Sequence, residues 1–87
     1  MLEEMIGEKI VIDMRSEYVC LGTLAGVNDH FFELKNVDMH DLRDTETTRE
    51  NYIAEAVAIG IQRNRKRILL NRNEVVSVAL LTDVVDD

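Results

Sequence analysis

The residue types that carry enzyme chemistry are sparse in this 87-residue chain, and their spacing is not that of a catalytic site. The single cysteine, Cys20, has no His–Asp or His–Asn pair arranged to activate it, and a thiol within an apolar run is usually inert. His30 and His40 lack companions at the spacings typical of zinc sites. There is no nucleophile–base pair and no glycine-rich phosphate-binding loop. The sequence therefore predicts a protein that is not an enzyme and that needs no metal or cofactor.

A group of carboxylates follows His30 and offers a second kind of chemistry. Asp38, Asp41 and Asp44 form an acidic stretch late in the N-terminal half of the chain. A divalent cation site is one interpretation, and it requires that these carboxylates converge on one ion. We favour the other interpretation, in which the stretch is a solvated loop.

Three β-rich runs provide the framework that must position these residues. They span Gly7–Met14, Tyr18–Val27 and His30–His40. Val, Ile, Tyr and Phe are frequent in them, as in partly buried strands, and no proline interrupts them. The connections are the short polar turns 15–17 and 28–29, which are too short for a parallel crossover. We predict a bent antiparallel meander.

Side-chain alternation within these runs predicts which face of each strand is buried. Ile10, Ile12 and Met14 share one face of the first run, which indicates a half-buried strand. Gly22 lies inside the second run, where a glycine permits a sharp bend or a close backbone approach. Upstream, the apolar stripe of residues 1–6 predicts a short helix across the open end of the sheet.

The segment of about 43–66 departs from the strand pattern and is predicted to be an insertion outside the sheet. Its sequence Thr47-Thr48-Arg49-Glu50 fits a capping box in which the Thr47 hydroxyl caps a helix and Glu50 reaches back. The apolar residues that follow have helical spacing: Ile53, Ala56, Val57 and Ile61. We predict a helix over about Thr48–Ala58. A strand over Ala56–Ile61 remains the alternative, because alternate residues there are also apolar.

Two further apolar runs, Arg67–Asn71 and Val75–Leu81, close the chain and bring the expected number of strands to five. The last run is apolar on both faces, which a strand edge exposed to water does not tolerate. A second copy of the chain is the simplest cover for it. The sequence therefore predicts a homo-oligomer.

Composition predicts one small domain over residues 1–87 that is soluble and cytoplasmic. Hydrophobic residues make up 46% of the chain, which favours a folded domain over a disordered one, and the 31% of charged residues favours a soluble surface. No apolar run approaches the roughly 20 residues of a membrane span, so no membrane association is expected. One cysteine suits a reducing compartment. The net charge of −7 opposes general binding to nucleic acid, but five of the ten basic residues lie between Arg63 and Arg72.

The order of these elements resembles the Sm and Sm-like (LSm) family, including its bacterial branch, Hfq. A short N-terminal helix and a three-strand block precede an insertion and a two-strand block. The residues that carry the resemblance are Gly7, Ile10 to Met14, Gly22-Thr23-Leu24, Asn28-Asp29, Phe31 to Val37 and Leu70-Asn71-Arg72-Asn73. The resemblance implies a strongly bent five-stranded antiparallel barrel, mostly β. It also implies a homo-oligomeric ring of six or seven subunits, in which the last strand of one subunit pairs with the fourth strand of its neighbour.

The resemblance further implies that single-stranded RNA binds at the central pore of the ring, through two turns of each subunit. Matched position by position, the turns are Asn28, Asp29 and His30, and Asn71, Arg72 and Asn73. Imidazole can stack on a base, amides can bind base edges, and guanidinium can hold a phosphate. The alternative is a homo-oligomeric scaffold with the same fold that has lost RNA binding.

Overall fold

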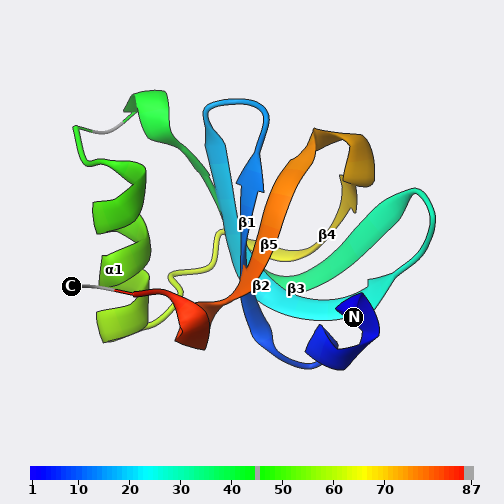
Figure 1. Ribbon diagram of the computed structural model, residues 1–87. Helices are drawn as coiled ribbons and strands as arrows, with labels where there is room; N and C mark the ends of the chain where they lie inside the picture. Colours follow the sequence, from blue (N-terminus) through cyan, green and yellow to red (C-terminus); the bar gives the residue numbers. More distant parts are fainter. Residues whose placement is uncertain (45, 86–87) are drawn as a thin grey trace.

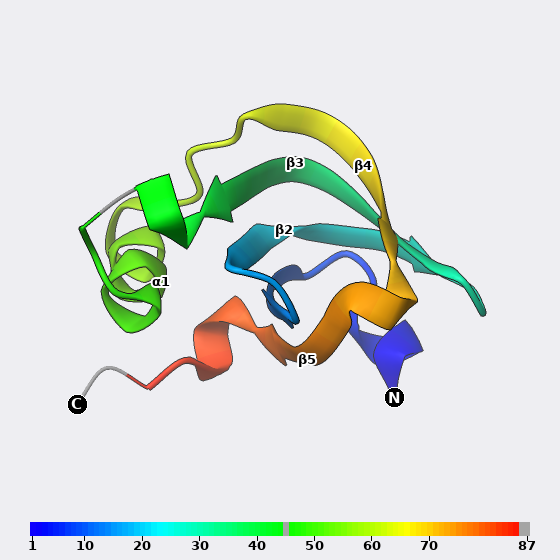
Figure 2. The same ribbon diagram turned by 90° about the horizontal axis from the view of Figure 1, so that it is seen from above.

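The computed structural model describes residues 1–44 and 46–85, and its main feature is one strongly bent antiparallel sheet of five strands. The strands are β1 (Lys9–Met14), β2 (Tyr18–Val27), β3 (Phe31–Asp41), β4 (Arg65–Asn71) and β5 (Val75–Leu80). Their order in the sheet is β4-β3-β2-β1-β5, so β4 and β5 are the edges. Figure 2 shows the bend: β4 arches along one side of the molecule and β5 lies along the opposite side. The predicted five-stranded, mostly β architecture is confirmed.

One α-helix and four single 3-10 turns complete the described chain. The helix α1 spans Arg49–Ile59, between β3 and β4. The 3-10 turns are η1 (Leu2–Met5), η2 (Leu42–Asp44), η3 (Arg72–Glu74) and η4 (Leu81–Asp83). The predicted N-terminal helix is thus a single 3-10 turn, whose Leu2 and Met5 pack against the interior of the sheet. Within the described residues no helix is long and apolar enough to cross a membrane.

The concave side of the sheet encloses the main core, here called the interior cluster. It consists of Ile10, Ile12, Cys20, Leu24, Phe32, Leu34, Val37 and Leu70. Ile10 and Ile12 are fully buried in it, as their alternation predicts. Val11 points to the opposite face and is buried as well, at 5% exposure, so the prediction of a half-buried strand is wrong: α1 covers the second face. Gly22 permits the close packing of β2 on β3, since a Cβ there would lie 3.2 Å from the Lys35 carbonyl oxygen. The β2–β3 register shifts at this glycine.

A second core, here called the outer cluster, lies on the other face of β1 and β2, where α1 packs (Figure 1). It consists of Val11, Val19, Leu21, Ile53, Ala56 and Leu81. Ile53 and Ala56 are three residues apart on α1 and are both buried, at 8% and 7% exposure. The insertion therefore lies outside the bent sheet, as predicted. Its helix also supplies one side of the outer cluster, through Ile53 and Ala56.

The ends of α1 differ from those predicted. Thr48, not Thr47, caps the helix: its hydroxyl accepts a hydrogen bond from the Asn51 backbone N–H at 3.1 Å. Glu50 is then the second helical residue rather than the third, so the predicted capping-box spacing is not met. The alternative of a strand over Ala56–Ile61 is wrong as well. The helix continues to Ile59 and ends at Gly60, whose φ of 92° suits a glycine.

Candidate functional site

The two polar turns, 28–30 and 71–73, lie side by side at one end of the sheet. The Arg72 backbone N–H donates a hydrogen bond to the His30 carbonyl oxygen at 2.9 Å. The Arg72 guanidinium donates to the Asn28 carbonyl oxygen at 2.6 Å. Residues more than forty positions apart in the sequence thus form one polar surface, and all six predicted site residues belong to it.

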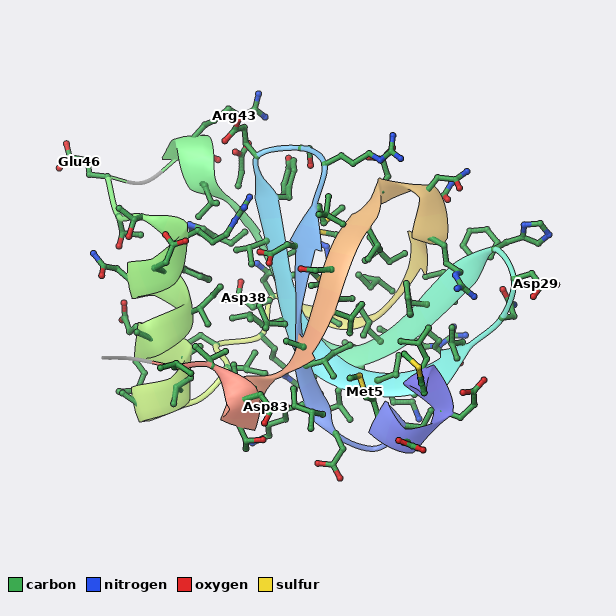
Figure 3. The ribbon with its side chains drawn as sticks, in the orientation of Figure 1. Met5, Asp29, Asp38, Arg43, Glu46 and Asp83 are labelled. Atoms are coloured by element: carbon green, nitrogen blue, oxygen red, sulfur yellow. The ribbon has the colours of Figure 1, made fainter. Side chains whose placement is uncertain are left out.

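The first turn is built around the side chain of Asn28. Its Oδ1 accepts hydrogen bonds from the backbone N–H groups of His30 and Phe31, each at 2.8 Å. These bonds occupy the side-chain oxygen of Asn28, so this residue shapes the turn. Asp29 and His30 are exposed, and Figure 3 places Asp29 at the tip of the turn. The solvent-facing groups of this turn therefore include the carboxylate of Asp29, the imidazole of His30 and the side-chain amide nitrogen of Asn28.

The second turn holds Arg72 in a defined position. Asn71 Oδ1 accepts from the Asn73 backbone N–H at 2.9 Å and so caps the 3-10 turn η3. The Arg72 guanidinium lies over the ring of buried Phe32, 5.4 Å from the ring centroid. A cation above an aromatic face is electrostatically favourable. Arg72 thus presents a positive charge fixed on both sides, by Phe32 and by the first turn.

Phe31 is a candidate site residue that the sequence-based site omits. It is 39% exposed, whereas Phe32 is buried at 3%. Its ring makes an edge contact with the His30 ring, with centroids 6.5 Å apart. Alternation along β3 could have identified it, because adjacent residues of a strand point to opposite faces. Two rings therefore stand next to each other at the start of β3, and each offers a π-face on which a base can stack.

The N-terminal turn also contributes to this surface. A hollow of about 350 Å³ is lined by Met1, Leu2, Glu3, Val27, Asn28, Asp29 and Arg72. The pKa of Glu3 is lowered by a hydrogen bond from its own backbone and by the N-terminal ammonium 3.1 Å away, with a smaller contribution from Arg72. The hollow thus contains two carboxylates beside the fixed guanidinium. Nothing in the spacing of residues 1–6 indicated this contribution.

Four other cations, Arg63, Arg65, Lys66 and Arg67, form a second positively charged region, here called the basic segment. It lies at the start of β4 and just before it, whereas the two turns lie beyond the end of that strand. A strand of this length spans roughly 20 Å, so the basic segment is remote from Arg72. Arg67 pairs with Glu33 at 2.5 Å and Arg63 donates to Asn36 Oδ1 at 2.7 Å.

The interpretation of the acidic stretch as a solvated loop is wrong for Asp38. This residue belongs to β3 and is only 5% exposed. The Tyr52 hydroxyl donates to one of its carboxylate oxygens, and Asn64 Nδ2 donates to the other at 3.3 Å. A buried carboxylate needs such donors, and α1 together with the segment before β4 supplies them. Asp38 therefore fastens the insertion to the sheet.

Two other groups that could carry chemistry, the Asp41 carboxylate and the Cys20 thiol, are hydrogen-bonded and buried, respectively. Asp41 ends β3, and hydrogen bonds from the Arg43 guanidinium and backbone lower the pKa of its carboxyl to about 2. Burial raises the pKa of the Cys20 thiol to about 12, so the thiolate is disfavoured. Over residues 1–44 and 46–85, no three His, Cys, Asp or Glu side chains converge as metal ligands do.

Neither a family model nor a curated protein matches the sequence. Two solved structures share its fold over most of their length. An Sm-like protein from Archaeoglobus fulgidus is 23% identical, with a TM-score of 0.62 over 92% of this chain and 88% of that one. The Sm protein of Pyrococcus abyssii, in complex with a uridine heptamer, is 11% identical, with a TM-score of 0.63 over 91% and 90%.

Proposed function

We propose that this chain, which has the fold of the Sm-like proteins, assembles into a closed ring of identical subunits and binds single-stranded RNA at the surface formed by its two turns. The observation that carries the proposal is the direct bonding of Arg72 to both His30 and Asn28. It joins the two turns that the Sm resemblance assigns to RNA. The similarity to the Pyrococcus abyssii protein, whose complex contains a uridine heptamer, supports the same ligand class.

The edges of the sheet support assembly. The outward edge of β4 and that of β5 carry no partner strand within the described residues. Leu69 on β4 is 55% exposed and Val76 on β5 is 66% exposed. Unpaired edges with apolar side chains favour pairing with another chain. Pairing β4 of one copy with β5 of the next satisfies both edges and, after six or seven copies, closes a ring.

The chemistry of the two turns suits a flexible, single-stranded ligand. The rings of His30 and Phe31 can stack on bases, and Arg72 can hold a phosphate or a base plane. Asn73 is exposed and adds amide donors and acceptors. One such surface is small, but its repetition around a ring raises the effective concentration of binding groups.

Titration of fluorescent heptauridine against the assembled protein at about 50 mM salt, where phosphate contacts are strongest, tests this proposal. His30→Ala should weaken binding about tenfold or more, since loss of one base stack costs roughly 1–3 kcal/mol. Arg72→Ala should abolish binding. Arg65→Ala, which removes an equal charge from the remote basic segment, is the control and should only reduce the salt dependence. A wild-type ring that does not bind at this salt concentration contradicts the RNA part of the proposal.

The second candidate function is a ring-shaped scaffold without RNA. The net charge of −7 per subunit and the placement of Glu3 and Asp29 beside Arg72 favour it. In addition, internal contacts already occupy part of the Arg72 guanidinium. The two candidates differ in one measurable result. The scaffold forms the same ring, and neither heptauridine nor heptaadenosine binds it.

A further inference from the structure

We propose that the basic segment of one subunit contacts Asp83 of the next subunit, and that this charge contact selects the pairing of β4 with β5 over other edge pairings. The partner is a second copy of this chain. The inference rests on the ring of the proposed function, and it names the residues of each copy that meet.

Apart from Arg67, the charges concerned lack ion-pair partners among the described residues of one subunit. Of the basic segment, only Arg67 has a carboxylate at ion-pair distance among the described residues. Arg63 and Arg65 donate to uncharged oxygens, those of Asn36 and Asn64, and Lys66 is exposed. Asp83 is likewise exposed and forms no ion pair with any residue in 1–44 or 46–85. Each subunit therefore carries an unneutralised basic region and an unneutralised acid at separate places.

The direction of the two edge strands brings these places together between copies. Figures 1 and 2 show that β4 and β5 run in opposite directions within one subunit. Successive copies in a ring of six or seven are related by a rotation of about 60° or less, which cannot reverse a strand. Hence β5 of the next copy still runs against β4. Antiparallel pairing sets the start of one strand beside the end of the other.

The residues at those strand ends are the unpaired charges. The start of β4 is Arg65, within the basic segment, and the end of β5 is Leu80, followed directly by η4 with Asp83. Opposite charges therefore face each other at one end of each subunit contact. Two antiparallel β4 edges, in contrast, would set each basic segment beside the end of the other β4, where Arg72 follows, and away from Asp83. Repulsion of this kind excludes wrong pairings and fixes register more than it adds affinity.

A charge-reversal series, followed by native mass measurement over a subunit concentration range, tests the contact. Asp83→Lys alone, and Arg65→Glu with Lys66→Glu, should each raise the subunit concentration at half-assembly about fivefold, since exposed ion pairs alter binding constants by up to about that factor. All three substitutions together should restore wild-type assembly. Raising salt from about 50 to 500 mM should weaken wild-type assembly and should strengthen that of either reversed variant.

Glu46→Lys provides the matched control, because it makes the same charge change at an exposed residue well away from Asp83 (Figure 3). It should assemble as the wild type does. If the wild type forms a ring and Asp83→Lys behaves like this control, the charge contact is wrong while the ring stands. If the wild type stays monomeric at every concentration, the ring itself is wrong, and the contact with it.

Discussion

The phenol ring of Tyr52 on α1 stacks on the imidazole of His40 on β3, with centroids 4.0 Å apart and planes 14° from parallel. The same Tyr52 donates its hydroxyl to Asp38, two residues earlier on β3. One side chain therefore joins the helix to the sheet by both stacking and hydrogen bonding. It lies next to the outer cluster, so apolar and polar contacts hold the insertion together.

Tyr52→Phe should lower the free energy of unfolding by about 1–3 kcal/mol, because it leaves a buried oxygen of Asp38 without its donor while keeping the aromatic ring. Urea denaturation measures the change. Tyr18→Phe is the control, since the Tyr18 hydroxyl makes no hydrogen bond to any described residue, and it should change stability little. Equal effects of the two substitutions would contradict a structural role for the Tyr52 hydroxyl.

Ile53→Ala should destabilise the fold by about 2–4 kcal/mol, because it removes buried methyl groups and leaves a cavity in the outer cluster. Val57→Ala is the matched control on the same helix. Val57 is 47% exposed, so this change should cost less than about 1 kcal/mol. Thermal or urea unfolding of both variants makes the comparison. A small effect at Ile53 would contradict a stabilising role for its side chain in the outer cluster.

The ion pair of Asp41 with Arg43 predicts a pH-dependent contribution to stability. The pKa of Asp41 is about 4 in the unfolded chain and is lowered to about 2 in the folded protein. The ionised carboxylate therefore stabilises the fold fully above about pH 4, and this contribution is lost as the pH falls from about 4 to about 2. Arg43→Ala should therefore lower stability at pH 6 and match the wild type near pH 2. Urea midpoints at the two pH values measure this. A difference that persists at pH 2 would exclude the ionised carboxylate as its source.

Val76→Asp should prevent assembly without unfolding the subunit, since Val76 is 66% exposed on the edge of β5. Sedimentation should show a single small species, and circular dichroism should be unchanged. Val78 is a poorer choice for this test because it packs against the interior cluster. Val85→Asp, at a residue that is 74% exposed beyond the strand, is the control and should still assemble, because it leaves the strand edge intact. A fully assembled Val76→Asp protein would exclude β5 from the contact between subunits.

The strand framework could be predicted because its information is local. Alternation around Ile10 and Ile12 determines the faces through the period of two in a strand. Gly22 determines the bend because it has no Cβ to block the close approach of β3. The predicted helix cap, Thr47, is one residue too early, because Thr47 and Thr48 are chemically equal as caps. Both carry the hydroxyl that caps a helix, so the local sequence does not distinguish them.

The candidate site was predicted less completely, for a physical reason. The Sm resemblance assigned residues 28–30 and 71–73 to the site, but the bond from Arg72 to the first turn depends on the bend of the whole sheet. The N-terminal residues of the hollow had no local signal at all. Asp38 was misassigned because a carboxylate is expected to be exposed, and its donors, Tyr52 and Asn64, come from outside its own strand.

The two apolar layers on β1 and β2 also determine how the molecule moves. Along β1 and β2, Ile12 and Cys20 face the interior cluster, and Val11 and Val19 face the outer cluster. Opening either layer still leaves these strands covered on the other side. Their amide protons should be the last to exchange with solvent, through opening of the entire domain, while β4 and β5 exchange through smaller local openings. The pair β1 and β2 is thus the part of the sheet that opens last, and the edge strands β4 and β5 can open while it stays folded.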